Sequence, residues 1–153
     1  MSIKNFNEKH GYMDNGKRPV ESEKNWSIWL REAHQYLRAG KNEKKRFDNS
    51  ILYNLLAMSL EKFVMAILAY NLSMPVNHTF TDLVESLEKF FPLDGELKDT
   101  ILSLETKQEI CSFEDYVRYE ISAEDIISLR EAVVKIAGIA GRVCVRSKAP
   151  VFL

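Results

Sequence analysis

A long apolar seam between residues 42 and 72 constrains this chain more than any other feature. Its members recur at steps of three and four residues, which is the spacing of one face of an α-helix. They are Tyr53, Leu56, Leu60, Phe63, Ile67 and Tyr70. The other faces of the same segment are also largely apolar, with Leu55, Met58, Val64, Met65 and Leu68. The sequence therefore predicts a helix that lies centrally or contributes a face to a partner subunit.

Local start and stop signals place the helices of the first half. Ser22 is a good N-cap for a helix that runs to about residue 39, and Gly40 supplies its stop. We expect Asn42 to cap the central helix and Pro75 to close the turn after it. The pattern indicates two consecutive helices.

Two capping boxes mark the helices of the second half. Thr79 with Asp82 opens a helix that Pro92 ends, and Ser122 with Asp125 opens a long final helix. A further helix is expected over residues 94–110. The small residues of the final helix favour a close helix crossing; they are Ala137, Gly138, Ala140 and Gly141. The sequence thus predicts an all-α fold, an up-and-down bundle of four to five helices.

Length and charge bound the class of protein. The 153 residues suit one domain, which we place at residues 22–147, with a flexible arm at 1–21 and a tail at 148–153. A net charge of -1 gives no whole-molecule attraction to nucleic acid or anionic lipid, so any RNA contact must use a local patch.

Targeting signals and cysteine chemistry point to an ordinary cytoplasmic protein. The N-terminal residues lack the apolar core of a signal peptide, and we expect no membrane span and a cytoplasmic location. Cys111 and Cys144 lack metal-ligand spacing and are expected to be reduced thiols. We expect no metal and no cofactor, since no Gly-rich phosphate loop, zinc ligand set or nucleophile elbow is present.

Four short pieces, taken in order, resemble the HEPN family of small helical bundles. They are Trp29 with Ala33, the run from Leu60 to Ala66 that contains Glu61-Lys62, the segment from Pro75 to His78, and Arg118-Tyr119. The resemblance covers about residues 26–142. It implies a separately encoded partner, such as the small nucleotidyltransferases that often accompany this family, and a history of metal-independent RNA cleavage. The apolar excess of the central helix and the small residues of the final helix favour a homodimer as the alternative.

Two departures from the family pattern argue against that cleavage. Met65 stands where many members carry a second Lys. The ribonuclease members carry an Arg, four to six residues and a His near the final helix, whereas this chain has no histidine after His78. Arg31 and His34 have only two residues between them and lie in the first helix. We therefore expect a non-catalytic binding module.

Arg31, His34 and Arg38 fall on one flank of the first predicted helix. We interpret them as an ordinary solvated flank, and the functional alternative is a small patch for an anion or phosphate.

Asn54 and Glu61 lie one heptad apart on the central helix, among the apolar residues Ala57, Met58, Met65 and Leu68. At least one of the two is therefore expected to be half buried. A buried carboxylate needs a partner, and Arg118, followed by Tyr119, is our preferred one. Such a pair is a structural tie that holds the connector of residues 111–121 on the bundle or, alternatively, part of a cleft for a nucleotide or a polar group of a partner. His78 precedes a helix N-terminus, where it is expected to cap or stack, or else to help bind an anion.

Three functions follow from these patterns. The first is a non-catalytic HEPN-like module that acts through dimerisation or a partner protein. The second is an RNA- or nucleotide-acting enzyme with a displaced site built from Arg118, Tyr119, Glu61 and one of the histidines His34 and His78. The third is an antitoxin or immunity protein whose surface masks a toxin.

Overall fold

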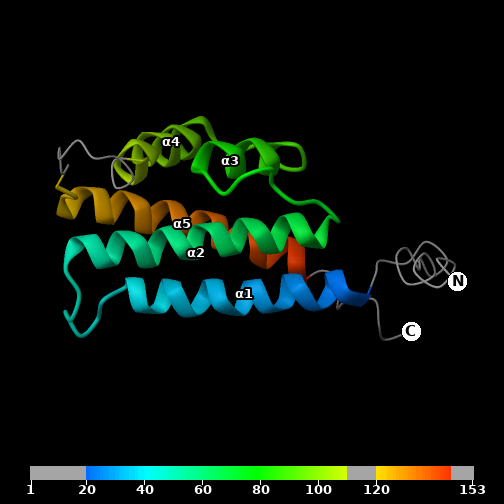
Figure 1. Cartoon of the computed structure of the whole chain (residues 1–153), viewed down its shortest axis with the longest axis horizontal. Helices are drawn as coiled ribbons and strands as arrows, with labels where there is room; N and C mark the ends of the chain where they lie inside the picture. Colours follow the sequence, from blue (N-terminus) through cyan, green and yellow to red (C-terminus); the bar gives the residue numbers. More distant parts are fainter. Residues whose placement is uncertain (1–19, 110–119, 146–153) are drawn as a thin grey trace, which may run out of the picture.

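A computed structural model describes residues 20–109 and 120–145, with side chains for residues 25–106 and 120–144 (Figure 1). Within these ranges the chain has five helices and no strand. The helices are α1 (Val20–Gly40), α2 (Asn49–Tyr70), α3 (Phe80–Glu88), α4 (Gly95–Glu109) and α5 (Ala123–Val145). The prediction of an all-α fold is confirmed.

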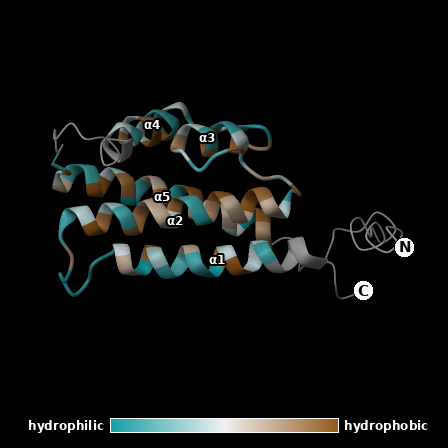
Figure 2. Ribbon diagram, in the orientation of Figure 1, coloured by the Kyte–Doolittle hydropathy of each residue, from teal (hydrophilic) through white to brown (hydrophobic). Residues whose placement is uncertain are grey.

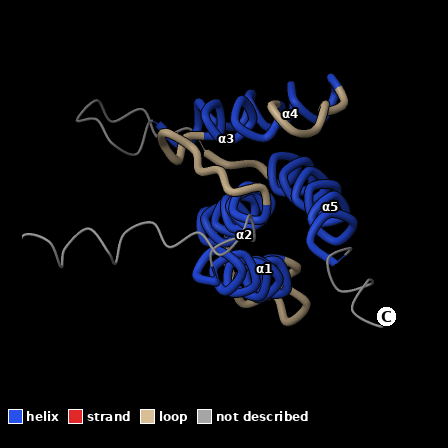
Figure 3. The backbone as a smooth tube through the Cα atoms, turned by 90° about the vertical axis from the view of Figure 1, so that its right-hand side faces the viewer, coloured by secondary structure: helices blue, strands red, loops and turns tan. Residues whose placement is uncertain are grey.

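Helix α2 lies at the centre and contacts α1, α3 and α5. Figure 1 shows α1 and α2 running in opposite directions, with α1 on one side of α2 and the α3–α4 layer on the other. The end-on view in Figure 3 shows α1, α2 and α5 as neighbouring rods beneath that layer. The chain returns through α3 and α4 before α5, which packs on α1, α2 and α4.

The burial of α2 explains its apolar composition. From Phe63 to Ala69 every residue of α2 is buried, and Figure 2 shows hydrophobic residues, in brown, along this helix. By length and composition α2 is the one described helix that is apolar enough to cross a membrane, but 67% of that apolar window is buried inside the fold. A central helix needs apolar side chains on several faces, so the predicted central position is confirmed.

The starts of α1 and α2 differ from the sequence prediction. Asp48 is the N-cap of α2, and its carboxylate accepts a 2.9 Å hydrogen bond from the amide of Ile51. Asn42 does not cap this helix, so that prediction was wrong. Helix α1 begins at Val20, so Ser22 lies within the helix and does not cap it.

The predicted capping box at Ser122 is confirmed in full, and at Thr79 the capping bond to the Asp82 amide is confirmed. The Thr79 hydroxyl accepts the amide of Asp82 at 3.1 Å and opens α3. Ser122 accepts the amide of Asp125 at 3.1 Å, while its own amide donates to the Asp125 carboxylate at 2.9 Å. Helix α3 ends at Glu88 and not at Pro92.

Buried hydrogen bonds join helices that are distant in sequence. The Tyr53 hydroxyl on α2 donates to the Leu104 carbonyl on α4 at 2.7 Å. The Ser59 hydroxyl donates to the Ala33 carbonyl on α1 at 2.8 Å. These bonds fix α1 and α4 against the central helix.

A second, smaller apolar cluster lies where α1 begins and where α2 and α5 end. It contains Trp26, Ala66, Ala69 and Cys144. Burial raises the pKa of the Cys144 thiol to about 11. This thiol is therefore protonated at neutral pH, while Cys111 lies outside the described residues.

The glycines of α5 do not lie at a helix crossing inside the fold. Gly138 and Gly141 are exposed, and a Cβ atom at Gly141 would meet nothing within 4 Å. Ala140, by contrast, is fully buried. The close approach occurs instead at Gly40, where a Cβ atom would lie 2.5 Å from Cδ2 of Leu56.

Candidate binding surface on α1 and the loop that follows it

A line of basic side chains follows the solvent face of α1. Arg31, His34, Arg38 and Lys41 are spaced by three, four and three residues, and all four are exposed. Arg31 and Arg38 form no hydrogen bond or ion pair with any residue that the structure describes. The predicted flank is thus a continuous stripe, and we refer to these four residues as the basic stripe.

Acidic side chains between residues 25 and 40 do not neutralise the basic stripe. The one acidic residue in this part of α1 is Glu32. Its carboxylate is 3.0 Å from Nζ of Lys62 on α2, so it is already paired. The stripe therefore keeps its charge.

His34 has a packing role as well as a place in the stripe. Its ring lies edge-on to the ring of Phe63 on α2, with centroids 4.9 Å apart and planes at 88°. Since Phe63 is fully buried, the imidazole covers one edge of the core. We therefore assign the charge of the stripe to its arginine and lysine members.

The loop between α1 and α2 is folded around Asn42. The Asn42 side-chain oxygen accepts the amides of Arg46 at 2.9 Å and Phe47 at 3.2 Å, and its nitrogen donates to the Phe47 carbonyl at 3.2 Å. Asn42 and Lys45 both have positive φ angles, of 52° and 50°. Asn tolerates this conformation and bonds to nearby backbone, which is why it organises the turn.

This folded loop extends the basic stripe. Lys44, Lys45 and Arg46 are exposed, and Phe47 beside them is 37% exposed. Residues 38–46 hold five basic side chains against Glu43 alone, a net charge of +4 in a chain of net charge -1. We call Lys44, Lys45, Arg46 and Phe47 the basic loop.

The opposite side of the molecule carries the compensating charge. Residues 80–106, which form the α3–α4 layer, hold seven acidic and two basic side chains, a net charge of -5. Figure 1 shows this layer and α1 on opposite sides of α2. Although the net charge of the chain is close to zero, the molecule thus has one basic and one acidic side.

Glu61 and His78 are brought together by the fold. Nδ1 of His78 lies 2.5 Å from Oε1 of Glu61. Glu61 is half buried on α2, as expected for one of the two polar residues, while Asn54 is exposed. His78 is not the cap of α3, since that role belongs to Thr79. Arg118 and Tyr119, the partners expected for Glu61, lie outside the described residues.

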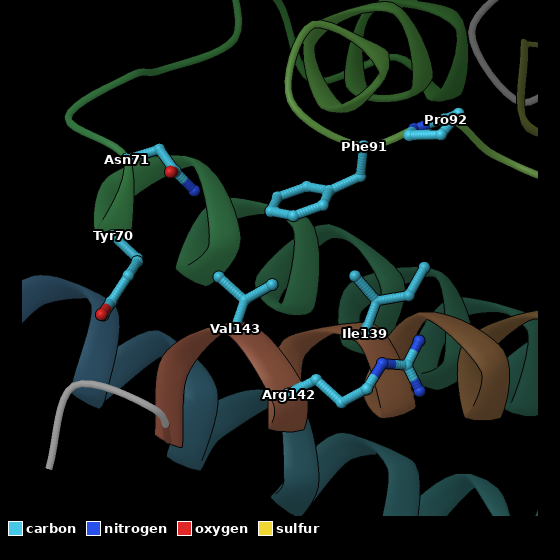
Figure 4. A pocket seen from close by; sticks show the side chains of 7 residues that line it. All are labelled: Tyr70, Asn71, Phe91, Pro92, Ile139, Arg142 and Val143. Carbon is cyan, nitrogen blue, oxygen red and sulfur yellow. The ribbon is translucent and has the colours of Figure 1, made fainter. Parts of the chain in front are cut away.

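An open pocket lies where α2 and α5 end, between these two helices and the α3–α4 loop (Figure 4). Its volume is about 480 Å³, and it is lined by Tyr70, Asn71, Phe91, Pro92, Ile139, Arg142 and Val143. Figure 4 shows the Phe91 ring lying over Val143 and Ile139. The Asn71 amide already donates to the Ile67 carbonyl at 2.8 Å, and the one charged side chain of the lining is Arg142.

Neither a search for metal-binding groups nor comparison with known proteins identifies a site. In residues 20–109 and 120–145, no group of three His, Cys, Asp or Glu side chains is arranged to hold a metal ion. Comparison of the chain with protein-family models, curated proteins and solved structures found no match.

The basic loop was not predicted from the sequence. Three members of the basic stripe were predicted, but neither Lys41 nor any residue of the loop was among them. The signal was present as five basic residues within positions 38–46. The predicted cap at Asn42 placed the following residues in the central helix, so no loop was expected there.

Proposed function

We propose that this chain is a non-catalytic, HEPN-like helical binding module whose ligand is single-stranded RNA held along the basic stripe and the basic loop. One observation carries the proposal: exposed basic side chains follow one another from Arg31 to Arg46, while acidic residues gather on the opposite layer. Contacts of lysine and arginine with phosphate supply most of the affinity in sequence-independent binding to nucleic acid.

The shape of the surface favours a single strand. Arg31 and Lys41 are ten residues apart, which at 1.5 Å per helical residue is about 15 Å, enough for several successive phosphates. The surface is one side chain wide along α1 and ends beside the exposed Phe47 ring. A basic track with an aromatic platform is the usual arrangement for single-stranded nucleic acid, because every base can stack on a ring.

The HEPN resemblance supports RNA as the strand, because the family has a history of acting on RNA. The missing Arg-x4-6-His motif supports binding without cleavage.

Fluorescence polarisation with labelled single-stranded RNA of mixed sequence tests this function. We expect binding at low salt, and we expect the logarithm of the binding constant to fall linearly with the logarithm of the salt concentration. Lys44→Glu should weaken binding and lower the salt slope by about 1, since one phosphate contact is lost. Lys89→Glu, the same change at an exposed site of the α3–α4 layer, is the control and should leave affinity unchanged.

Phe47→Ala tests the stacking platform and should weaken binding to RNA but not to an unstacked polyanion such as heparin. Absence of RNA binding at low salt, or equal effects of Lys44→Glu and Lys89→Glu, would contradict the proposed function.

The Glu61–His78 contact favours a second candidate, an RNA-acting enzyme with a displaced site. A carboxylate that holds one imidazole nitrogen orients the ring and leaves the other nitrogen available for proton transfer. The His78 side chain is 57% exposed and so accessible to a substrate. RNA cleavage that is lost in His78→Ala and retained in His34→Ala would support this candidate, and cleavage unaffected by His78→Ala would exclude it.

A further inference from the structure

The open pocket where α2 and α5 end has no part in the proposed RNA binding. The basic loop precedes the first residue of α2, whereas Tyr70 and Asn71 of the pocket lie at the C-terminal end of that helix. The pocket volume of about 480 Å³ is within the range of sites that bind small molecules. A mainly apolar lining with a few polar groups is also typical of such sites, and this lining has that composition.

Apolar side chains from two separate elements form one wall of the pocket. Ile139 and Val143 lie one turn apart on α5, and Phe91 comes from the α3–α4 loop. All three are half-buried and pack against the core with part of their surface. Figure 4 shows the Phe91 ring lying over the two aliphatic side chains. A flat hydrocarbon group in this pocket can therefore pack against an aromatic ring and branched aliphatic groups together.

Arg142 supplies the one charge of the lining. Its side chain is exposed and forms no hydrogen bond or ion pair with any residue that the structure describes. The lining contains no acidic residue that could neutralise it. Figure 4 shows the guanidinium group beside Ile139, so the charge adjoins the apolar wall. A ligand that matches both features carries a negative charge next to an apolar body.

The charge of the pocket favours a carboxylate over a phosphate group. A guanidinium group binds a carboxylate through two parallel hydrogen bonds and balances its single charge. A phosphate monoester carries nearly two negative charges at neutral pH, and the lining offers no second cation. The second charge would remain unpaired beside an apolar wall, which is unfavourable.

Asn71 makes another part of the lining polar and so limits the length of the apolar body. Its side-chain nitrogen donates one hydrogen to the Ile67 carbonyl at 2.8 Å, and the amide keeps a second N–H and a carbonyl oxygen. Figure 4 shows this amide and the Arg142 guanidinium on opposite sides of the Phe91 ring. The apolar wall between them suits a single ring better than a long acyl chain.

We propose that this pocket binds a small arylalkyl monocarboxylate, with its carboxylate on the Arg142 guanidinium and its ring against Phe91 and Val143. The ligand bridges α5 and the α3–α4 loop. This site shares no residue with the basic stripe or the basic loop, so the binding goes beyond the proposed function and does not depend on it.

NMR spectroscopy of the isotope-labelled full chain tests the site, with phenylacetate as the probe. We expect phenylacetate to shift the amide signals of Asn71, Phe91 and Val143, with a dissociation constant of about 1 mM or below. Phenylacetamide has the same ring without the charge, and acetate has the charge without the ring. Each should bind at least about tenfold more weakly than phenylacetate.

Arg142→Gln removes the charge at an exposed position, so the variant should remain folded, which circular dichroism checks. We expect it to bind phenylacetate at least about tenfold more weakly and to bind phenylacetamide as the wild type does. Arg38→Gln, the same change at an exposed site of α1, is the matched control and should bind phenylacetate like the wild type. The proposal is overturned if phenylacetate does not bind at about 10 mM, or if Arg142→Gln binds it as tightly as the wild type.

RNA binding by the same two variants separates this site from the proposed function. Arg38→Gln should weaken RNA binding, whereas Arg142→Gln should leave it unchanged. A chain that binds RNA but not phenylacetate would overturn the pocket ligand alone. Binding of phenylacetate without RNA would support the pocket ligand and contradict the proposed function.

Discussion

The Ser59 hydroxyl on α2 donates a hydrogen bond to the Ala33 carbonyl on α1 across a fully buried interface, at 2.8 Å. We expect Ser59→Ala to lower the free energy of unfolding by about 1 kcal/mol, the usual net value of one such bond. Urea denaturation should show a lower midpoint with an unchanged slope. Ser50→Ala, at an exposed position of the same helix, should have a smaller effect.

Two glycine substitutions should shift stability in opposite directions. Gly40→Ala places a methyl group 2.5 Å from Cδ2 and 2.9 Å from Cγ of Leu56, whose side chain is fully buried and confined. We expect it to cost about 1–3 kcal/mol through overpacking.

Gly141→Ala adds a methyl group into open space on α5. It should stabilise the chain by up to about 1 kcal/mol, because Ala has the higher helix propensity. Thermal unfolding at a concentration where the chain is monomeric separates the two variants, and a stabilising Gly40→Ala would contradict the close contact with Leu56.

The buried Cys144 should make stability fall at high pH. Burial raises its pKa from an ordinary value of 9.0 to about 11, so between these values the folded thiol stays protonated while the unfolded one ionises. The folded state then binds more protons, and its stability decreases as pH rises through this window, by about 1 kcal/mol per pH unit. Urea titrations at about pH 8 and pH 10 should show this loss, and Cys144→Ala should reduce it.

The contact between Glu61 and His78 should contribute little to stability. More than half of the His78 side chain is exposed, so solvent screens the interaction. We expect His78→Ala to cost less than about 1 kcal/mol, less than Ser59→Ala. A double-mutant cycle with Glu61→Gln measures the coupling, and a coupling of several kcal/mol would show that the pair is a structural tie.

The features that the sequence predicted correctly are local. The capping boxes at Thr79 and Ser122 each join residues three apart, and the seam of α2 depends only on helical spacing. Such interactions form within one or two turns, so their pattern is visible along the chain.

The candidate sites depended more heavily on the tertiary structure. His78 meets Glu61 across 17 residues of sequence, a contact that no spacing rule predicts. Likewise the role of Asn42 was open, because Asn serves equally well as a helix cap and as the centre of a turn. Three hydrogen bonds to the backbone of Arg46 and Phe47 decide in favour of the turn and create the basic loop.

The sequence by itself determined that this chain is helical and that α2 is central, because periodicity and composition express which faces must avoid water. Only the tertiary structure decided which faces remain outside. The same small residues of α5 suit an internal crossing or an outer surface, and the packing of Val133 and Ala140 into the core is what turns Gly138 and Gly141 towards solvent. Burial is a property of all the helices together, and no single segment encodes it.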